Sequence, residues 1–317
     1  MNYFVHGATL ALAWFLAINV LVSAAVVLAA IRPPRLASSL LALRLLPAML
    51  STAFVAIVFL PSYWTFEPRD FPEGFDLTLT ALAGLAVIVL VGTASRTAGV
   101  WWRAVRRARV WTQTAAPLAL AGIEVPAFRI DAPEPVMALV GIFRTRLIVT
   151  RGLIEALTPE EIAAGAAHEA AHDRARDNLT RLAMRGAPDV LHWTRAARVL
   201  ERRWAAAAEH RADAAASIVG SRAARLALAS ALVKIARLMP AAAPLGEPIS
   251  TLVGGGEIAA RVERLIDDGP HRGANRRRPG ALWTVLAIAA AAALAAGYLP
   301  LLETIHRTTE ILVQRLP

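Results

Sequence analysis

An uncharged apolar segment from residue 7 to residue 31 is the feature that most limits what this chain can fold into. As a helix rising about 1.5 Å per residue, it is long enough to cross a hydrocarbon core of about 30 Å. Similar segments cover residues 37–61, 77–94 and 281–302. The composition agrees, because 56% of the residues are apolar, only 18% are charged and the mean hydropathy is +0.49. Since this is too apolar for a soluble enzyme, we predict four transmembrane helices.

A cleaved signal peptide is the alternative interpretation of the first apolar segment. No basic residue precedes this segment, and it is longer than the apolar part of an ordinary signal peptide. We therefore interpret residues 7–31 as a membrane span.

The charges between the apolar segments predict how the chain crosses the membrane. Residues 62–76 are acidic and aromatic. Arginines gather after the first and third segments, near the start of the second and before the fourth: Arg32, Arg35, Arg44, Arg96, Arg103, Arg106, Arg107, Arg109, Arg272 and Arg276–Arg278. Because positive residues stay on the cytosolic side, the N-terminus is predicted to lie outside. The organisation is then three spans in 1–95, a cytosolic domain in 96–280, a fourth span in 281–302 and a short extracytoplasmic tail in 303–317.

The net charge of +10 raises the question of a nucleic-acid partner. The arginines lie beside apolar segments instead of forming a separate basic domain, so we expect contact with anionic membrane lipids and no nucleic acid. A lipid-surface or nucleic-acid binder stays an alternative, and its binding would be lost at moderate salt and would survive metal removal.

A strand-like pattern occupies residues 122–150 and predicts a small antiparallel sheet. One edge strand is expected within Met137–Phe143. Two interpretations stay open for it. Ala138, Leu139, Val140 and Gly141 bind an extended substrate by strand addition, or the segment is an ordinary hairpin that covers the helices.

A helix is predicted to begin at Thr158, because Thr158 and Glu161 have the spacing of a capping box and Pro159 suits the first helical position. His168 and His172 lie four residues apart on this helix, so both imidazoles leave the same face and can bind one metal ion. Glu169 points about a hundred degrees away, where a carboxylate reaches a metal-bound water without binding the ion. The chain has no cysteine, so imidazole and carboxylate groups must provide the ligands of a single Zn²⁺.

A second helical stretch, from Val190 to Val219, offers the missing ligand. Glu209 is the expected third zinc ligand, and Asp213, four residues later, is expected to accept the free N–H of a ligating histidine. Alternatively, these two carboxylates form a solvated acidic face.

Other residues could also take part in the site. Asp177 could bind the metal or form an ion pair with Arg174 or Arg181, and His192 and His210 are further candidate ligands. His210 follows Glu209 directly, so it should face away from it. A later short helix, residues 259–266, is expected to expose Arg261, Glu263 and Arg264.

These residues resemble the membrane zinc peptidases of the BlaR/MecR antibiotic-sensor family. The resemblance rests on the arrangement of spans and on Gly141–Arg144, His168–His172, Arg176–Asp177, Leu191–Trp193, and Glu209 with Asp213. It implies a mainly α membrane protein with a cytosolic α+β gluzincin-type domain, with His168, His172 and Glu209 on zinc and Glu169 as general base. The chain departs from the family at Thr194–Arg195, where Asn-Pro is usual, and at Ala212, where Cys is usual. The receptors' C-terminal sensor domain is missing, so β-lactam sensing is not implied.

The HtpX-like and prenyl-protease group has a similar Glu209-to-Asp213 spacing, but its spans are commonly divided differently around the motif. The expected function is therefore a zinc-dependent endopeptidase in the bacterial inner membrane that cleaves a cytosolic or membrane-proximal protein in regulatory signalling. The alternatives are an HtpX-like quality-control protease and a non-catalytic zinc receptor or scaffold. A separate sensor or repressor protein and a homo-oligomer are partners that the resemblance allows.

Overall fold

Three long apolar helices open the chain in the computed structural model, which describes residues 3–34, 36–69, 76–218, 222–238, 250–251, 258–267 and 297–315. The first is α1 (Tyr3–Ala29). The second is α2 (Ala37–Ala53), which continues through the π-helical η1 (Phe54–Phe59) into α3 (Leu60–Phe66), and the third is α4 (Leu77–Gln113). All three are long and apolar enough to cross a membrane.

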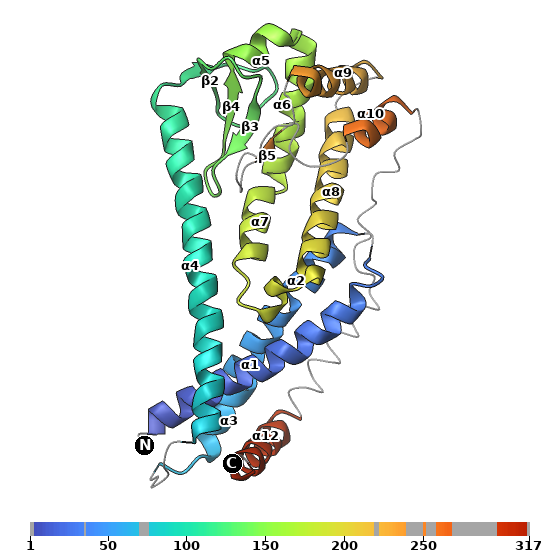
Figure 1. The fold of residues 1–317 in the computed structure, drawn as a ribbon. Helices are drawn as coiled ribbons and strands as arrows, with labels where there is room; N and C mark the ends of the chain where they lie inside the picture. Colours follow the sequence, from blue (N-terminus) through green and yellow to red (C-terminus); the bar gives the residue numbers. More distant parts are fainter. Residues whose placement is uncertain are drawn as a thin grey trace.

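The fourth predicted span, 281–302, lies outside the described residues except for 297–302, as does the arginine cluster before it. The described end of this span opens α12 (Tyr298–Gln314), so the predicted tail is helical. In Figure 1, α12 lies at the same end of the molecule as α3 and the N-terminus, far from the sheet.

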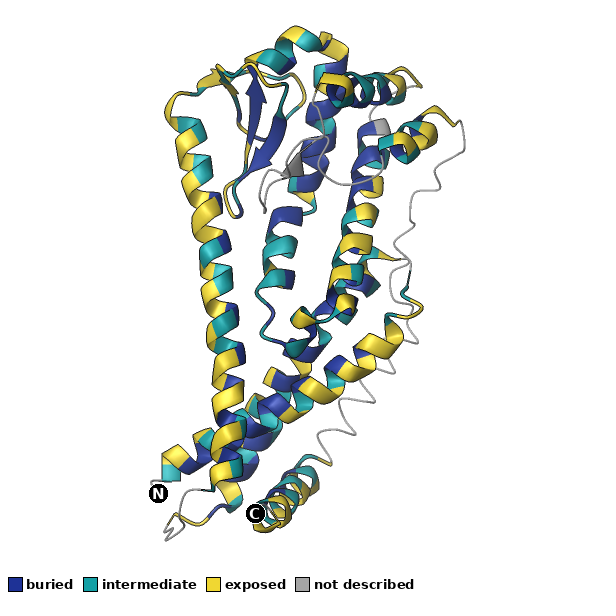
Figure 2. Ribbon diagram, in the orientation of Figure 1, coloured by how far each residue is buried: buried dark blue, intermediate teal, exposed yellow. Residues whose placement is uncertain are grey.

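α4 extends well beyond the predicted third span and across the predicted domain boundary at residue 95. Its 37 residues correspond to a helix of about 56 Å, nearly twice the thickness of a hydrocarbon core. Figure 1 shows it running from α3 up to the sheet. Along its apolar half the outward side chains are themselves apolar, with Leu85, Ile88 and Val91 exposed (Figure 2). An exposed apolar stripe of this kind suits lipid and not water.

Five short strands form one sheet in the order β1-β2-β4-β3-β5. They are β1 (Ala116–Leu118), β2 (Ala127–Ile130), β3 (Met137–Val140), β4 (Arg146–Thr150) and β5 (Ser250–Thr251). The sheet is mixed, because β2 pairs in parallel with β4, and the prediction of an antiparallel sheet is wrong at this pair. The alternation of apolar and polar residues shows which side chains share a face of a strand, but it does not show which strands pair with it.

The expected edge strand is also different in the structure. β3 lies between β4 and β5, and Ala138 and Leu139 pair with Thr251 and Ser250. The amide of Asn178 donates to the carbonyls of Leu139 and Gly141, at 3.1 and 2.8 Å. At Gly141 φ is +97°, and a Cβ there would collide with the carbonyl of Arg144, so the turn of the β3–β4 hairpin requires glycine. Backbone groups of this segment that a substrate strand would need for pairing therefore already form hydrogen bonds within the protein.

A group of helices after β4 carries the predicted motif. They are α5 (Arg151–Ala156), α6 (Pro159–Arg174), α7 (Asp177–Arg185), the 3₁₀ turn η2 (Val190–Trp193), α8 (Arg195–Ile218), α9 (Arg222–Leu238) and α10 (Ile258–Ile266). The predicted start of the motif helix is confirmed, because Thr158 and Glu161 form both hydrogen bonds of a capping box. One face of the sheet, with Met137, Leu139 and Val149, belongs to the same buried cluster as α6 and α9. The opposite face, with Ala138 and Ile148, packs on the end of α4.

A buried polar network joins the membrane helices to this helical domain. Asn19 of α1 donates to Ser51 of α2 and to the carbonyl of Pro188, and it accepts from the N–H of Val190. Arg44 of α2 is fully buried and donates to Asp189 and Glu201, each at 2.8 Å. Arg44, interpreted from the sequence as a marker of the cytosolic side, is thus an internal anchor.

Replacing Arg44 with alanine is expected to destabilise the protein by roughly 3–5 kcal/mol, because the buried carboxylate of Asp189 would lose its cation. The measurement is thermal unfolding of detergent-purified protein. Arg32→Ala is the matched control, because Arg32 is exposed in the neighbouring turn. Equal unfolding temperatures for the two variants would contradict the anchoring role.

Candidate metal centre

Three buried side chains bring one donor atom each to a common point. His168 and His172 come from α6 and Glu209 from α8. The two Nε2 atoms are 3.2 Å apart, and the Glu209 carboxylate oxygens lie 3.5 Å from His168 Nε2 and 3.6 Å from His172 Nε2. α6 and α8 pack directly on each other, and the small residues Ala208 and Ala212 of α8 are at most 1% exposed. The structure therefore brings together the three residues predicted as metal ligands.

The spacing of these atoms fits a zinc ion. Zinc in proteins is tetrahedral with bonds of roughly 2.1 Å, which separates neighbouring ligand atoms by about 3.4 Å. The observed separations of 3.2, 3.5 and 3.6 Å lie close to that value. Two imidazoles and one carboxylate leave a fourth position for water, as in hydrolytic zinc sites.

Glu169 adds an independent observation. Its side chain is fully buried, and neither carboxylate oxygen has a hydrogen-bond partner among the described residues. Burial raises the pKa of this carboxyl, while His172 and His168 oppose the shift. A buried carboxylate without hydrogen bonds is costly, so a water at the metal position is a natural partner for it.

A carboxylate lies behind each histidine. Asp213 Oδ1 is 3.0 Å from His168 Nδ1, and Asp177 Oδ2 is 2.6 Å from His172 Nδ1. When each Nδ1–H faces a carboxylate, the Nε2 lone pair is directed to the metal position. The sequence leaves Asp177 as a candidate ligand or as an ion-pair partner of Arg174 or Arg181. In the structure its carboxylate instead contacts Nδ1 of His172. Its other oxygen accepts from Arg211 at 2.6 Å.

A break between two helices gives Asp177 this position. α6 ends at Arg174, Arg176 has a left-handed backbone with φ of 54°, and Asp177 begins α7. The turn directs the Asp177 carboxylate back towards α6. The spacing of five residues between His172 and Asp177 indicates that the two are near each other, but the local sequence pattern does not reveal the left-handed turn at Arg176.

The carboxylates also change the acidity of the ligands in the metal-free site. Burial lowers the pKa of His172, but Asp177 and Glu209 outweigh this effect and raise it to about 9. Burial would raise the pKa of Glu209, yet hydrogen bonding to His168 and His172 holds it well below its ordinary value. A cation at this position would therefore replace protons that the site otherwise holds.

Arg261 is part of the site, and the prediction that this side chain is exposed is wrong. It is 2% exposed, and its guanidinium donates to both oxygens of Asp213, at 3.0 and 2.6 Å. It also lies 3.1 Å from Glu209 Oε2. Arg261 and Leu265 share the buried face of α10, so the arginine lies within the apolar stripe of that helix. Its position in this apolar stripe is the sequence feature that could have predicted its burial.

The remaining candidates lie elsewhere. His210 is exposed, as predicted from its position after Glu209, and His192 is half-buried beside Trp193.

Leu139, from the proposed substrate-binding strand, lines a polar pocket of about 330 Å³. The pocket is also lined by His172, Asp177, Asn178 and the exposed Phe143. Of the three ligand residues, His172 lines this pocket, which lies between the β3–β4 hairpin and α7.

Replacing Asp177 with asparagine is expected to weaken zinc binding roughly 10- to 100-fold, because the amide no longer holds His172 by a charged hydrogen bond. Competition with a chromophoric chelator measures the affinity. Asp173→Asn is the matched control, since Asp173 adjoins His172 but accepts instead from Thr145. The assignment fails if both variants bind zinc as the wild type does.

Comparison with known families identifies the same region of the chain. Residues 106–250 match the model of Peptidase family M48, a zinc-dependent family. The matched stretch contains strands β1 to β4, both ligand helices and Asp177, and it ends before Arg261. A search of curated proteins found no match. The match indicates a metallopeptidase of a membrane type, and the closer relationship to the BlaR/MecR peptidases stays a prediction.

Proposed function

We propose that the protein is an integral-membrane zinc-dependent endopeptidase whose active site faces the cytosol close to the bilayer. The observation that carries this proposal is Glu169, a buried carboxylate without a hydrogen-bond partner among the described residues, beside three converging ligand atoms. A structural zinc site has no use for such a group, whereas a hydrolase needs a base at this position. The match to Peptidase family M48 supports the same conclusion.

Each residue then has a defined task. Zinc held by His168, His172 and Glu209 would lower the pKa of its water to about 7. Glu169 accepts a proton from the attacking water and passes it to the amine that leaves when the peptide bond breaks. Burial raises the pKa of this carboxyl, which makes Glu169 a stronger base than an exposed glutamate.

Arg261 has a supporting task. It holds Asp213 in place behind His168 and brings a positive charge next to Glu209. The chain's three tyrosines, Tyr3, Tyr63 and Tyr298, all lie in the membrane helices or α12, so the catalytic domain has no phenol to assist the reaction. Arg261 and Arg181 are cationic donors near the ligand Glu209, at 3.1 and 3.8 Å from its carboxylate oxygens.

The surroundings of the site support a membrane-proximal protein as substrate. An apolar groove of about 770 Å³ lies between α4 and the α7 region, and its lining includes Leu90 and Phe143. Phe143 also lines the polar pocket that contains His172. A polypeptide that leaves the bilayer along α4 would therefore pass Phe143 before it reaches the ligand residues.

Metal removal tests the function directly. The full chain, purified in detergent, is expected to cleave a fluorescently labelled unfolded protein, to lose this activity when zinc is removed with phenanthroline, and to regain it when zinc is returned. Cleavage that survives complete zinc removal would contradict a zinc mechanism. Stoichiometric zinc without cleavage would favour the receptor or scaffold alternative.

The pattern of products separates the two peptidase alternatives. A regulatory peptidase is expected to cut one protein at one position, whereas an HtpX-like quality-control protease is expected to cut many unfolded membrane proteins. A separate sensor or repressor, a homo-oligomer and a bacterial inner-membrane location remain part of the proposal.

A further inference from the structure

A second group of metal-binding side chains lies at the end of the molecule opposite the sheet. His6 belongs to α1, Glu67 follows α3, and His306 and Glu310 belong to α12. Figure 1 shows α3, α12 and both termini together at that end. We propose that Glu67, His306 and Glu310 form a second divalent-metal site, of the zinc class, which His6 borders and which is separate from the centre at His168.

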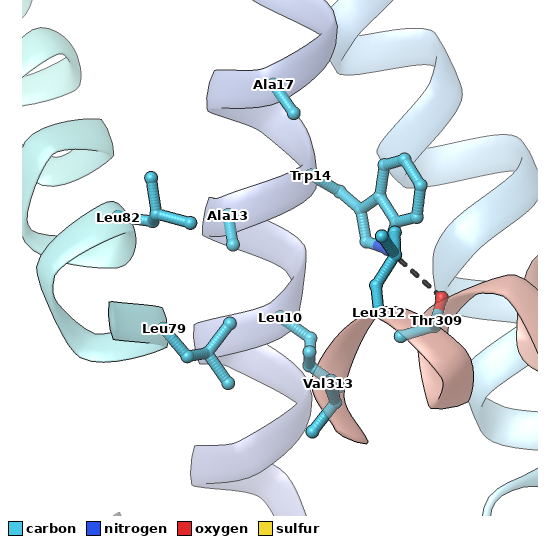
Figure 3. A pocket seen from close by; sticks show the side chains of 9 residues that line it. All are labelled: Leu10, Ala13, Trp14, Ala17, Leu79, Leu82, Thr309, Leu312 and Val313. Carbon is cyan, nitrogen blue, oxygen red and sulfur yellow. Dashed lines mark hydrogen bonds between the residues drawn. The ribbon is translucent and has the colours of Figure 1, made fainter. Parts of the chain in front are cut away.

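The docking of α12 creates this group. Trp14 of α1 donates its indole N–H to Thr309 at 3.1 Å, and Ser62 of α3 donates to the carbonyl of Leu302 at 2.6 Å. Below the Trp14–Thr309 hydrogen bond, Leu10, Leu312 and Val313 point into an apolar cavity of about 170 Å³ that α1, α4 and α12 enclose (Figure 3). α12 is therefore held on both α1 and α3.

The docked helix presents two donors on one face. His306 and Glu310 are four residues apart, so they project from α12 in the same direction, one turn apart. Ligand atoms of Glu67, His306 and Glu310 all lie within 4.8 Å of one another. His306 Nδ1 is 3.4 Å from Glu67 Oε2, which is about the edge of a tetrahedral zinc site. On the other side of the same carboxylate, His6 Nε2 is 3.9 Å from Glu67 Oε1.

The side chains around the proposed ion are largely shielded from water. That of Glu67 is 4% exposed and that of His306 is 20% exposed. The attraction between a carboxylate and a divalent cation is stronger at such a position than in bulk water. An imidazole among the ligands suits zinc, whereas calcium and magnesium prefer oxygen ligands alone.

A metal ion here would join two parts of the chain that are far apart in sequence, the end of α3 and α12. It would fasten α12 to the other membrane helices at the end remote from the peptidase centre. If the proposed orientation holds, this site faces the outside. The inference does not rest on the peptidase function, because none of its residues belongs to the centre at His168.

Zinc analysis of the full chain in detergent tests the site. The wild type, saturated with zinc and freed of excess, is expected to hold about two ions per chain. His168→Ala/His172→Ala and Glu67→Gln/His306→Ala should each retain about one, and His210→Ala, the control, about two. A wild type with one ion that only the His168/His172 variant loses would overturn the proposal.

A second experiment keeps a ligand in place, in case Glu67→Gln/His306→Ala does not fold. The chain has no cysteine, so His306→Cys introduces a single thiol. With Co²⁺, this variant is expected to show a thiolate-to-cobalt charge-transfer band that Glu67→Gln weakens. Arg307→Cys is the control, since the Arg307 side chain is 73% exposed one residue away. Equal spectra for His306→Cys and Arg307→Cys would mean that His306 does not bind a metal.

Discussion

Replacing Glu169 with glutamine is expected to lower the rate of peptide cleavage by roughly 10²- to 10⁴-fold, which is the range that a positioned general base contributes. Glutamine has nearly the same shape but cannot accept the proton of the attacking water. Because Glu169 is not among the three converging ligand residues, the zinc content should stay at the wild-type level. The measurement is the initial cleavage rate of protein with a verified zinc content.

The control for this variant comes from the same helix. Glu160→Gln removes an exposed carboxylate in the first turn of α6 and should leave the cleavage rate unchanged. A Glu169→Gln protein that cleaves at the wild-type rate would exclude Glu169 as the base. The site would then have to activate water through another residue.

Replacing Glu209 with alanine is expected to weaken zinc binding at the catalytic centre roughly 10²- to 10³-fold. The estimate divides a typical zinc-binding free energy of about 10–16 kcal/mol among four ligands. The variant also leaves Arg261 without the nearby carboxylate oxygen, which now lies 3.1 Å away. Competition with a chelator measures the affinity, and cleavage activity should fall in parallel at low zinc concentration.

His210→Ala is the matched control, because it changes the next residue of α8 on its exposed side. An unchanged zinc affinity in Glu209→Ala would show that another residue completes the ligand set, and Asp213 would then be the first to test. Its Oδ1 already lies 3.0 Å from His168 Nδ1.

Much of the local structure could be predicted from the sequence. The capping box at Thr158 and Glu161 determines where α6 begins, and the spacing of His168 and His172 places both imidazoles on one side of it. The long apolar segments determine three long membrane-type helices. These features depend on residues a few positions apart, and helix geometry connects such residues directly.

The fold and the site also depend on contacts that no local pattern contains. The parallel pairing of β2 with β4 and the burial of β3 between β4 and β5 join segments whose alternation is compatible with several orders. The same limit applies to Asp177, whose direction depends on a left-handed turn at Arg176. A sequence pattern shows which face a residue occupies but not which element covers that face.

The sequence by itself therefore determined the membrane helices, the motif helix and the choice of His168, Glu169 and His172. Only the tertiary structure decided that Arg261, 93 residues beyond His168, lies in the same site, and that Arg44 anchors a membrane helix to Asp189. It also decided that His6, Glu67 and His306 meet. In each case a buried charged or polar group has its partner on a distant part of the chain. The pairing stabilises the protein only after the helices have packed together, so no short segment of the sequence reveals it.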